Sequence, residues 1–576
     1  MVMDLTDPVI VRPPEKCSDS SALARKLFWI SLVTFFIVKS WLSWGRYLNQ
    51  DEFESLHQGW LLYSGATQYK DFNSNHPPVA FALLGTLNYF TEDTVTLILL
   101  ARLLTFVSAG GTLWLLFHIG RSVYNSNAAY WTVILLAFNA TFLEWSTEVR
   151  TDFVMIPLWL AAVGIAVQRQ PRSVVRQMIS IGLLMGTAFW VNQKVVFHAL
   201  PLGIFILLGG PDRRWRFRDV GVAVLASLLP AVIMFGHAWL EGALLDLIRH
   251  NFGGAWGLVQ EAPYAAVRWR TAANVVIRDP GFVRLVAASL FAAFGVGENR
   301  RSHLFLVGTA LWMAFSFFLT PGPFPYYMLH VFPLFAVITG GWIDRIQTDP
   351  SRGAQGTPRW GGNRLVVYVA LLAVFPVIRM AKFVYPTITN QFRVIMVASQ
   401  LTTPETRVFD GAGALIRRPD AYPFHWVLWA SEINKLHAGQ LPPLIPTLRE
   451  NECRLVIETY RVHSLPLSDR QVLNQQFVRL WGPLRVPGYD SLTPINSDKQ
   501  TFELWYNGVY KSNKPELIID GLPMEKPRFL EAGWHSMQLP GTSGRVQLME
   551  VGVSQGIELP EEIDPLTFLG MYGYGY

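Results

Sequence analysis

The chain has 576 residues, of which 51% are apolar, 13% aromatic and only 16% charged. Globular soluble domains carry about 25% charged residues, so this balance excludes an ordinary soluble composition, disorder, collagen and a coiled coil. The net charge of +6 does not call for a nucleic-acid partner, because arginines in the cytoplasmic loops of a membrane protein explain it. The two cysteines, Cys17 and Cys453, are too few for a disulfide scaffold or a cysteine-based zinc site.

Long apolar runs fill most of the first 385 residues. A transmembrane helix needs about 20 mostly apolar residues, and eleven stretches qualify, some of them weakly. The first is too long for a signal peptide, and no small-residue cleavage site follows it. The expected spans lie near 27–46, 94–118, 127–145, 152–168, 177–193, 195–211, 219–240, 281–297, 303–320, 325–343 and 365–385.

Lysine and arginine residues set the expected orientation in the cytoplasmic (inner) membrane. With residues 1–26 placed as a cytoplasmic tail, alternation of the spans puts most loop lysines and arginines on the inner side. Eleven spans then carry the C-terminal region to the periplasmic or extracellular side. Cys17 and Cys453 fall on opposite sides of the membrane under this topology, so they cannot pair within one chain.

Two of the expected outer loops are long, at 47–93 and 241–280, and loops of this length are usually functional or disordered. Apolar residues at helical spacing predict a short helix over 52–64. Pro77-Pro78 predicts the start of a second one. Both are too short to span the bilayer, so we expect them to lie along its outer surface.

The long apolar runs end at about residue 386, and shorter patterned segments follow. Strand-like runs between amphipathic segments predict an extracytoplasmic α/β module over 386–475. Short, turn-separated runs then predict a β-rich module over 476–576, with the pattern of a small β-sandwich. The expected strands are Thr406–Asp410, Arg454–Tyr460, Thr501–Tyr506, Glu516–Ile519, Gly533–Gln538 and Val546–Val551, with a hairpin turn at Asp520-Gly521.

Unusual polar residues gather at the outer ends of the expected spans. Ionisable groups at this depth are costly and favour a functional interpretation. Separate acidic and basic groups around one pocket suit a reaction at a lipid-linked phosphate, in which a carboxylate takes a proton and cations stabilise the leaving phosphate. The residues are Asp51, Glu52, Asp71, His76, Glu148, Arg150, Asp152 and Lys194.

The ordered set of motifs resembles the GT-C class of integral membrane glycosyltransferases, in the protein mannosyltransferase and aminoarabinose transferase superfamily. The resemblance covers about residues 20–385 and begins with a first outer loop that matches in several places. The matching segments are Asn49-Gln50-Asp51-Glu52-Phe53, Gly65, Asp71-Phe72, His76-Pro77-Pro78, Ala101-Arg102-Leu103, Arg150-Thr151-Asp152, Lys194, Tyr326-Tyr327, His330 and Pro333.

This resemblance implies an α-helical polytopic catalytic domain over 27–385. It also implies an inverting transferase that moves a sugar from a polyprenyl phosphate to an extracytoplasmic glycan, lipid or protein, with no required cofactor. Asp51 would be the general base, and Glu52 would orient it or the acceptor. The remaining candidates would bind donor or acceptor: Asp71, His76, Glu148, Arg150, Asp152, Lys194, Arg249, Arg268, Arg270, Tyr326, Tyr327 and His330. The outer carboxylates could also hold a divalent cation, although the sequence shows no dense ligand cluster.

Structural roles compete with these assignments. Asp51-Glu52 could cap a helix, Asp152 could be an N-cap, Lys194 could extend toward lipid head groups, and His330 could be a packing histidine. Other functions also compete: a ligase or polymerase acting on pyrophosphate-linked glycans, a secondary transporter, or an anchor for the outer region. The short cytoplasmic loops and the lack of a Walker A pattern argue against an ATP-driven pump.

Overall fold

The computed structural model describes residues 19–168, 173–211, 217–253, 265–291, 300–319, 324–348, 387–495, 499–541 and 543–569 apart from 553 and 555, together with part of 367–378. Most of the expected tail 1–26, most of the expected span 365–385, and Cys17 therefore lie outside the described residues.

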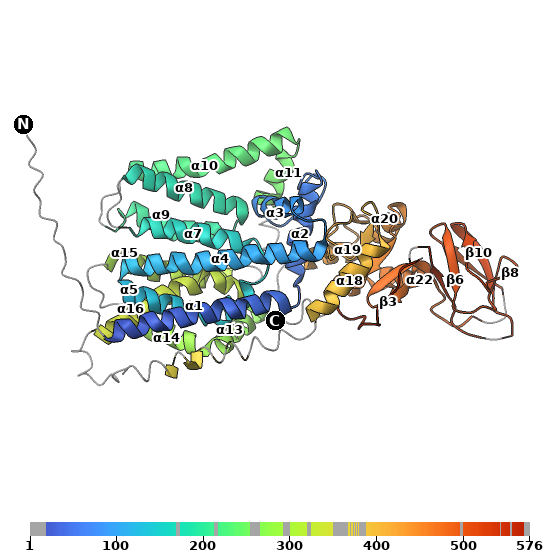
Figure 1. Cartoon of the computed structure of the whole chain (residues 1–576). Helices are drawn as coiled ribbons and strands as arrows, with labels where there is room; N and C mark the ends of the chain where they lie inside the picture. Colours follow the sequence, from blue (N-terminus) through green and yellow to red (C-terminus); the bar gives the residue numbers. More distant parts are fainter. Residues whose placement is uncertain are drawn as a thin grey trace, which may run out of the picture.

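A bundle of apolar helices forms the N-terminal two thirds of the chain (Figure 1). Four described helices are long and apolar enough to cross a membrane: α1 (Asp19–Gly45), α4 (Thr94–Val123), α8 (Val174–Val191) and α10 (Phe217–Leu240). The chain is thus a multi-pass membrane protein, while the count of eleven spans stays a prediction. Further helices complete the bundle: α5 (Ser126–Ala137), α6 (Ala140–Trp145), α7 (Asp152–Ala166), α9 (Val195–Leu207), α14 (Pro280–Phe291), α15 (Arg300–Leu319) and α16 (Phe332–Thr348).

Two of the expected spans are interrupted. The segment 127–145 divides into α5 and α6 because Asn139 takes an extended conformation and its side chain caps Phe142 N. Asp279, from a distant part of the chain, accepts from the first backbone amides of α6 at 2.6 and 3.1 Å. The segment 325–343 begins as a 3₁₀ helix, η4 (Pro325–His330), before α16 continues it.

The two long loops hold short helices, most of them at the end of the bundle that faces the C-terminal region (Figure 1). The helices expected in the first loop are confirmed as α2 (Gln50–Tyr63) and α3 (Val79–Gly85), which η1 (Thr86–Tyr89) follows. Gly59 and Gly85 let the first two approach closely, since a Cβ on Gly85 would lie 2.7 Å from Gly59 O. The second loop contains α11 (Leu244–Ile248), a π-helical turn over Arg249–Gly253, and α13 (Ala265–Arg278).

The C-terminal region is mixed α/β and then β. Its main sheet has the order β1-β2-β4-β11-β6-β9, with β3 also paired to β4, so it runs across the boundary expected at 475. A second sheet has the order β5-β10-β7-β8. The elements are α18 (Thr387–Leu401), β1 (Val408–Phe409), α19 (Ala430–His437), α20 (Leu444–Glu450), β2 (Leu455–Ile457), α21 (Tyr460–His463), α22 (Leu467–Gln476), β3 (Phe477–Trp481), β4 (Leu484–Asp490), β5 (Gln500–Leu504), β6 (Gly508–Ser512), β7 (Ile518–Ile519), β8 (Leu522–Pro523), β9 (Arg528–Leu530), β10 (Gly533–Gln538) and β11 (Gln547–Glu550).

The two sheets enclose one apolar core, to which Phe502 and Met537 of one sheet and Tyr510 and Leu548 of the other contribute. This is the sandwich that the short runs predicted. The β7–β8 hairpin turns at Asp520-Gly521, where both residues have positive φ (52° and 79°). Two successive residues of this kind are typical of the tight turn that joins twisted strands.

The α/β part packs directly on α2. His57 of α2 lies 2.7 Å from an oxygen of Asp420 through Nε2, and 2.8 Å from Ile416 O through Nδ1. Arg461 of α21 donates to Gln50 at 3.2 Å. The helix that begins beside Asp51 is therefore held between the bundle and the C-terminal region.

Candidate active site

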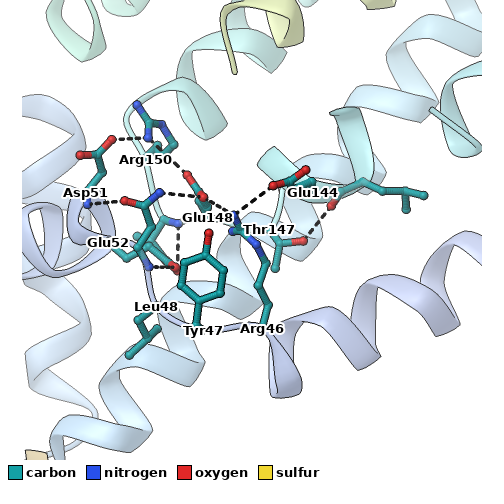
Figure 2. Close-up of polar contacts among 12 residues, drawn as sticks. Arg46, Tyr47, Leu48, Asp51, Glu52, Glu144, Thr147, Glu148 and Arg150 are labelled. Atoms are coloured by element: carbon teal, nitrogen blue, oxygen red, sulfur yellow. Dashed lines mark hydrogen bonds and ion pairs between the residues drawn. The ribbon is translucent and has the colours of Figure 1, made fainter. Parts of the chain in front are cut away.

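A cluster of acidic and basic side chains lies where α2 meets the turn between α6 and α7. Arg150 Nη1 forms an ion pair with Asp51 and lies 3.3 Å from Glu148 Oε2 (Figure 2). The Nε of Arg150 lies 3.5 Å from Asp152 Oδ2. The three carboxylates differ in exposure, since Asp51 is 39% exposed whereas Glu148 and Asp152 are at most 2% exposed. Asp51 is therefore the acidic group of this cluster that an incoming substrate can reach.

Asp152 contacts three residues from two further elements, the turn before α9 and η4. Lys194 Nζ lies 3.6 Å from Asp152 Oδ1, and His330 Nε2 lies 2.9 Å from the same oxygen. Asn192 Nδ2 donates to it at 3.1 Å. The structure thus brings together the acidic turn, the basic turn before α9 and η4, which the sequence separates by almost two hundred residues.

Two tyrosines of η4 form an aromatic wall beneath the cations. The Arg150 guanidinium carbon lies 3.5 Å from the centre of the Tyr326 ring, and Lys194 Nζ lies 4.2 Å from the centre of the Tyr327 ring. A cation over an aromatic face is attracted by the quadrupole of the ring, whose face is electron-rich. Both positive groups are thereby held against η4. The Asp51 cluster is defined as Asp51, Glu148, Arg150, Asp152, Lys194, Tyr326, Tyr327 and His330.

Glu52 has a different position from Asp51. It is fully buried, and its oxygens accept from Arg102 Nη2 at 2.8 Å and Arg102 Nε at 2.9 Å. With Asn49 it also forms a capping box at the start of α2, which the alternative interpretation anticipated for this acidic pair. Glu52 thus fixes the first turn of α2, which carries Asp51, and this is how it can orient Asp51.

The sequence interpretation missed a second layer of charges behind the Asp51 cluster. Arg46 Nη2 lies 2.5 Å from Glu148 and 3.7 Å from Glu144, and Arg278 Nη1 lies 2.9 Å from Glu144 (Figure 2 shows Arg46 and Glu144). Arg46 thus contacts Glu148 directly, and Glu144 links Arg46 to Arg278. Arg46 carried a signal, because it is the last residue of the first expected span, whereas Glu144 was hidden inside the expected span 127–145.

Lys39 of α1 also has partners inside the bundle. Its Nζ donates to Ser146 O at 2.6 Å and to Ser146 Oγ at 3.1 Å. Lys39 is fully buried and therefore faces a partner inside the bundle rather than the lipid head groups. Lys39 therefore supports the turn that leads to Glu148 and Arg150.

Several candidates lie away from the cluster. Asp71 is exposed and accepts from Thr67 N at 2.7 Å, so it stabilises its own turn. Arg249 is exposed and lies 4.0 Å from Asp246, and Arg270 is exposed on α13. The side chain of Arg268 lies outside the described residues. A phosphate-binding arginine from 241–280 therefore stays a prediction.

His76 lies in the first outer loop, near Lys194. Burial, and then the positive charge of Lys194, lower its pKa to about 4, so the imidazole is neutral at physiological pH. Its carbonyl oxygen accepts from Gln68 Nε2 at 2.6 Å and from the Tyr69 hydroxyl at 2.7 Å. A neutral imidazole suits a hydrogen bond with a substrate hydroxyl better than an ion pair with phosphate.

Metal use is not decided by the described side chains. Within the described ranges, no group of three or more His, Cys, Asp and Glu residues is arranged to hold a metal ion. The carboxylates of the Asp51 cluster are instead paired with arginine, lysine and histidine.

Replacing Glu54 with glutamine is expected to flatten the pH dependence of stability. Burial and the neighbouring Asp51 charge raise the pKa of Glu54 from 4.5 to about 8. The native state therefore binds more protons than the unfolded chain between these values, and the free energy of unfolding falls as the pH rises through this interval. We expect the wild type to lose about 3 kcal/mol more than Glu54→Gln between pH 5 and pH 8.

Denaturant titration in mixed micelles at several pH values measures this difference. The exposed Glu516 on the sandwich supplies the matched control, because Glu516→Gln should leave the wild-type slope unchanged. Equal slopes for wild type and Glu54→Gln would contradict the assignment.

Comparison with known proteins supports the resemblance that the motifs indicated. Residues 75–239 match the sequence family described as dolichyl-phosphate-mannose-protein mannosyltransferase. This match covers less than a third of the chain, and it confirms the expected glycosyltransferase resemblance. No curated protein matches the chain in sequence.

Solved structures extend the comparison to the fold. The chain is similar to ArnT from Cupriavidus metallidurans bound to undecaprenyl phosphate, with a TM-score of 0.57 and 13% identity over 81% of this chain and 98% of that one. The apo state of the same protein gives a TM-score of 0.56 with 13% identity, over 82% of this chain and 98% of that one. Archaeal AglB from Archaeoglobus fulgidus gives 0.48 and 12% identity over 79% and 72%. The ArnT likeness shows the fold over 81% of this chain.

Proposed function

We propose that this membrane glycosyltransferase transfers a sugar from a polyprenyl-phosphate donor to a hydroxyl group of an extracytoplasmic glycan, lipid or protein, with inversion. The observation that supports this function best is the Asp51 cluster. In it the accessible carboxylate of Asp51 pairs with Arg150, and Arg150 and Lys194 both lie beside Asp152. The fold shared with a protein solved with undecaprenyl phosphate supports a donor of the same chemical class.

The proposed reaction is a single displacement. Asp51 takes the proton of the acceptor hydroxyl while that oxygen forms a bond to the anomeric carbon of the sugar. The bond from this carbon to the phosphate oxygen breaks, and its electron pair leaves on the phosphate. Lys194 and Arg150 stabilise the negative charge that develops there. One carboxylate is enough, because phosphate is already a good leaving group.

The remaining residues of the cluster position these groups. Asp152 holds Lys194 and His330 at one oxygen, so it sets the distance between the cations and the aromatic wall. Glu148 links Arg150 to the buried Arg46. In this proposal the reaction takes place at the outer face, with the N-terminus in the cytoplasm and the C-terminal region outside.

A donor panel tests the function. Purified full chain in detergent is incubated with acceptor extract and with sugars linked to polyprenyl phosphate or to polyprenyl pyrophosphate, and the released lipid is identified by mass spectrometry. We expect release of polyprenyl monophosphate from at least one monophosphate donor. Release only from pyrophosphate donors would support a ligase or polymerase. No release from folded protein would refute the transferase proposal and favour transport.

A further inference from the structure

A wide groove lies in the C-terminal region, away from the Asp51 cluster. It has a volume of about 890 Å³ and lies between helices α20 and α22 on one side and the sheet of β5 and β10 on the other. Its walls include the aromatic residues Tyr489, Trp505, Tyr506 and Trp534. A volume near the upper end of the range for small-molecule sites leaves room for several linked rings.

Trp534 forms an exposed flat surface in this groove. Its side chain is 73% exposed, and it lies opposite Glu503 in the β5–β10 register, so both side chains are on the same face of the sheet. Glu503 in turn lies 2.6 Å from Arg449 of α20. The indole therefore stands on the face that looks across the groove toward α20, rather than in the core of the sandwich.

Gln476 supplies a buried acceptor that lacks a partner. The residue is 6% exposed and lines the groove, and its Nε2 donates to Glu503 O at 3.2 Å. Its Oε1 has no hydrogen-bond partner among the described residues. Buried polar atoms are normally hydrogen-bonded, so this oxygen indicates a donor that arrives with a ligand.

We propose that this groove binds an oligosaccharide chain. A pyranose ring has an apolar C–H face that packs on an indole, and hydroxyl groups at its edge that donate to Gln476 Oε1 and Glu503 or accept from Arg449. The rim also carries Glu450 and Glu452, which disfavours nucleic acid and other polyanions. This inference goes beyond the proposed function, because the groove shares no residue with the Asp51 cluster.

Titration of the full chain with defined sugars tests the proposal. The probes are hexasaccharides of β-1,4-linked glucose, β-1,4-linked N-acetylglucosamine and α-1,6-linked mannose, and binding is followed by saturation-transfer NMR in detergent. We expect at least one probe to bind with a dissociation constant of about 0.1 mM. Trp534→Ala should weaken that binding by about tenfold, and Trp534→Phe by less, because a smaller ring remains.

Phe529 of β9 supplies the matched control. It is a 58% exposed aromatic residue of the same sandwich and is not among the residues that line the groove. Phe529→Ala should bind the probe within about twofold of the wild type. Failure of all three probes, or equal binding by Trp534→Ala and wild type, would overturn the proposal.

Donor release measured on the same wild-type preparation separates the two proposals. Release without sugar binding refutes the groove proposal alone, and sugar binding without release refutes only the transferase proposal.

Discussion

Asp51→Asn is expected to lower the rate of sugar transfer by about 10²–10⁴-fold, the usual contribution of a general base. Asparagine has nearly the same shape and still accepts a hydrogen bond from Arg150, but it cannot take the proton of the acceptor hydroxyl. The loss should therefore appear in kcat, with little change in the KM for the donor. Single-turnover release of polyprenyl phosphate, measured for wild type and variant, distinguishes these two quantities.

Glu92→Gln supplies the control for this experiment. Glu92 is an exposed carboxylate in the same outer loop, so the variant removes one charge without touching the Asp51 cluster. We expect its rate to stay close to that of the wild type. Thermal unfolding of Asp51→Asn should also match the wild type, because Asp51 is 39% exposed. A well-folded Asp51→Asn with more than a tenth of wild-type activity would exclude Asp51 as the base.

The gathering of candidate residues could be predicted in part, because polar residues at span ends are rare and costly. Arg150, Asp152 and Lys194 each stand at the end of an apolar run, and antiparallel spans bring such ends to one level of the membrane. Asp71 shows the limit of this argument. Asp71 lies in the same loop as Asp51, yet its carboxylate accepts a hydrogen bond from the backbone of its own turn.

Contacts between distant segments could not be predicted from local patterns. The pairing of Arg46 with Glu148 depends on the break after α5, which an uninterrupted apolar run conceals. The same holds for the C-terminal sheet, where β4 pairs with β2 and with β11 and so joins two regions that look different in sequence. Strand identity follows from residue type and alternation, whereas strand partners follow from packing.

Arg102→Leu is expected to destabilise the fold strongly. Arg102 is 1% exposed and binds Glu52 through two nitrogens, while its Nη1 donates to Ser43 O at 2.8 Å and Arg46 O at 3.0 Å. Removal of one partner of a buried ion pair leaves the other charge unpaired, which costs about 3–5 kcal/mol. Denaturant titration in mixed micelles, followed by tryptophan fluorescence, should show a loss of this size.

The double variant Arg102→Leu with Glu52→Gln separates the ion pair from the other contacts. It removes the unpaired charge, so it should recover part of the lost stability, but the carbonyl groups of Ser43 and Arg46 still lack their donor. Arg121→Leu, at the exposed far end of the same helix, should change the free energy of unfolding by less than about 0.5 kcal/mol. A loss below about 1 kcal/mol for Arg102→Leu would contradict a structural role for the pair. Glu52 fixes the first turn of α2, so Arg102→Leu should also displace Asp51 and reduce the rate of sugar transfer. The double variant should regain little of this activity even where it regains stability.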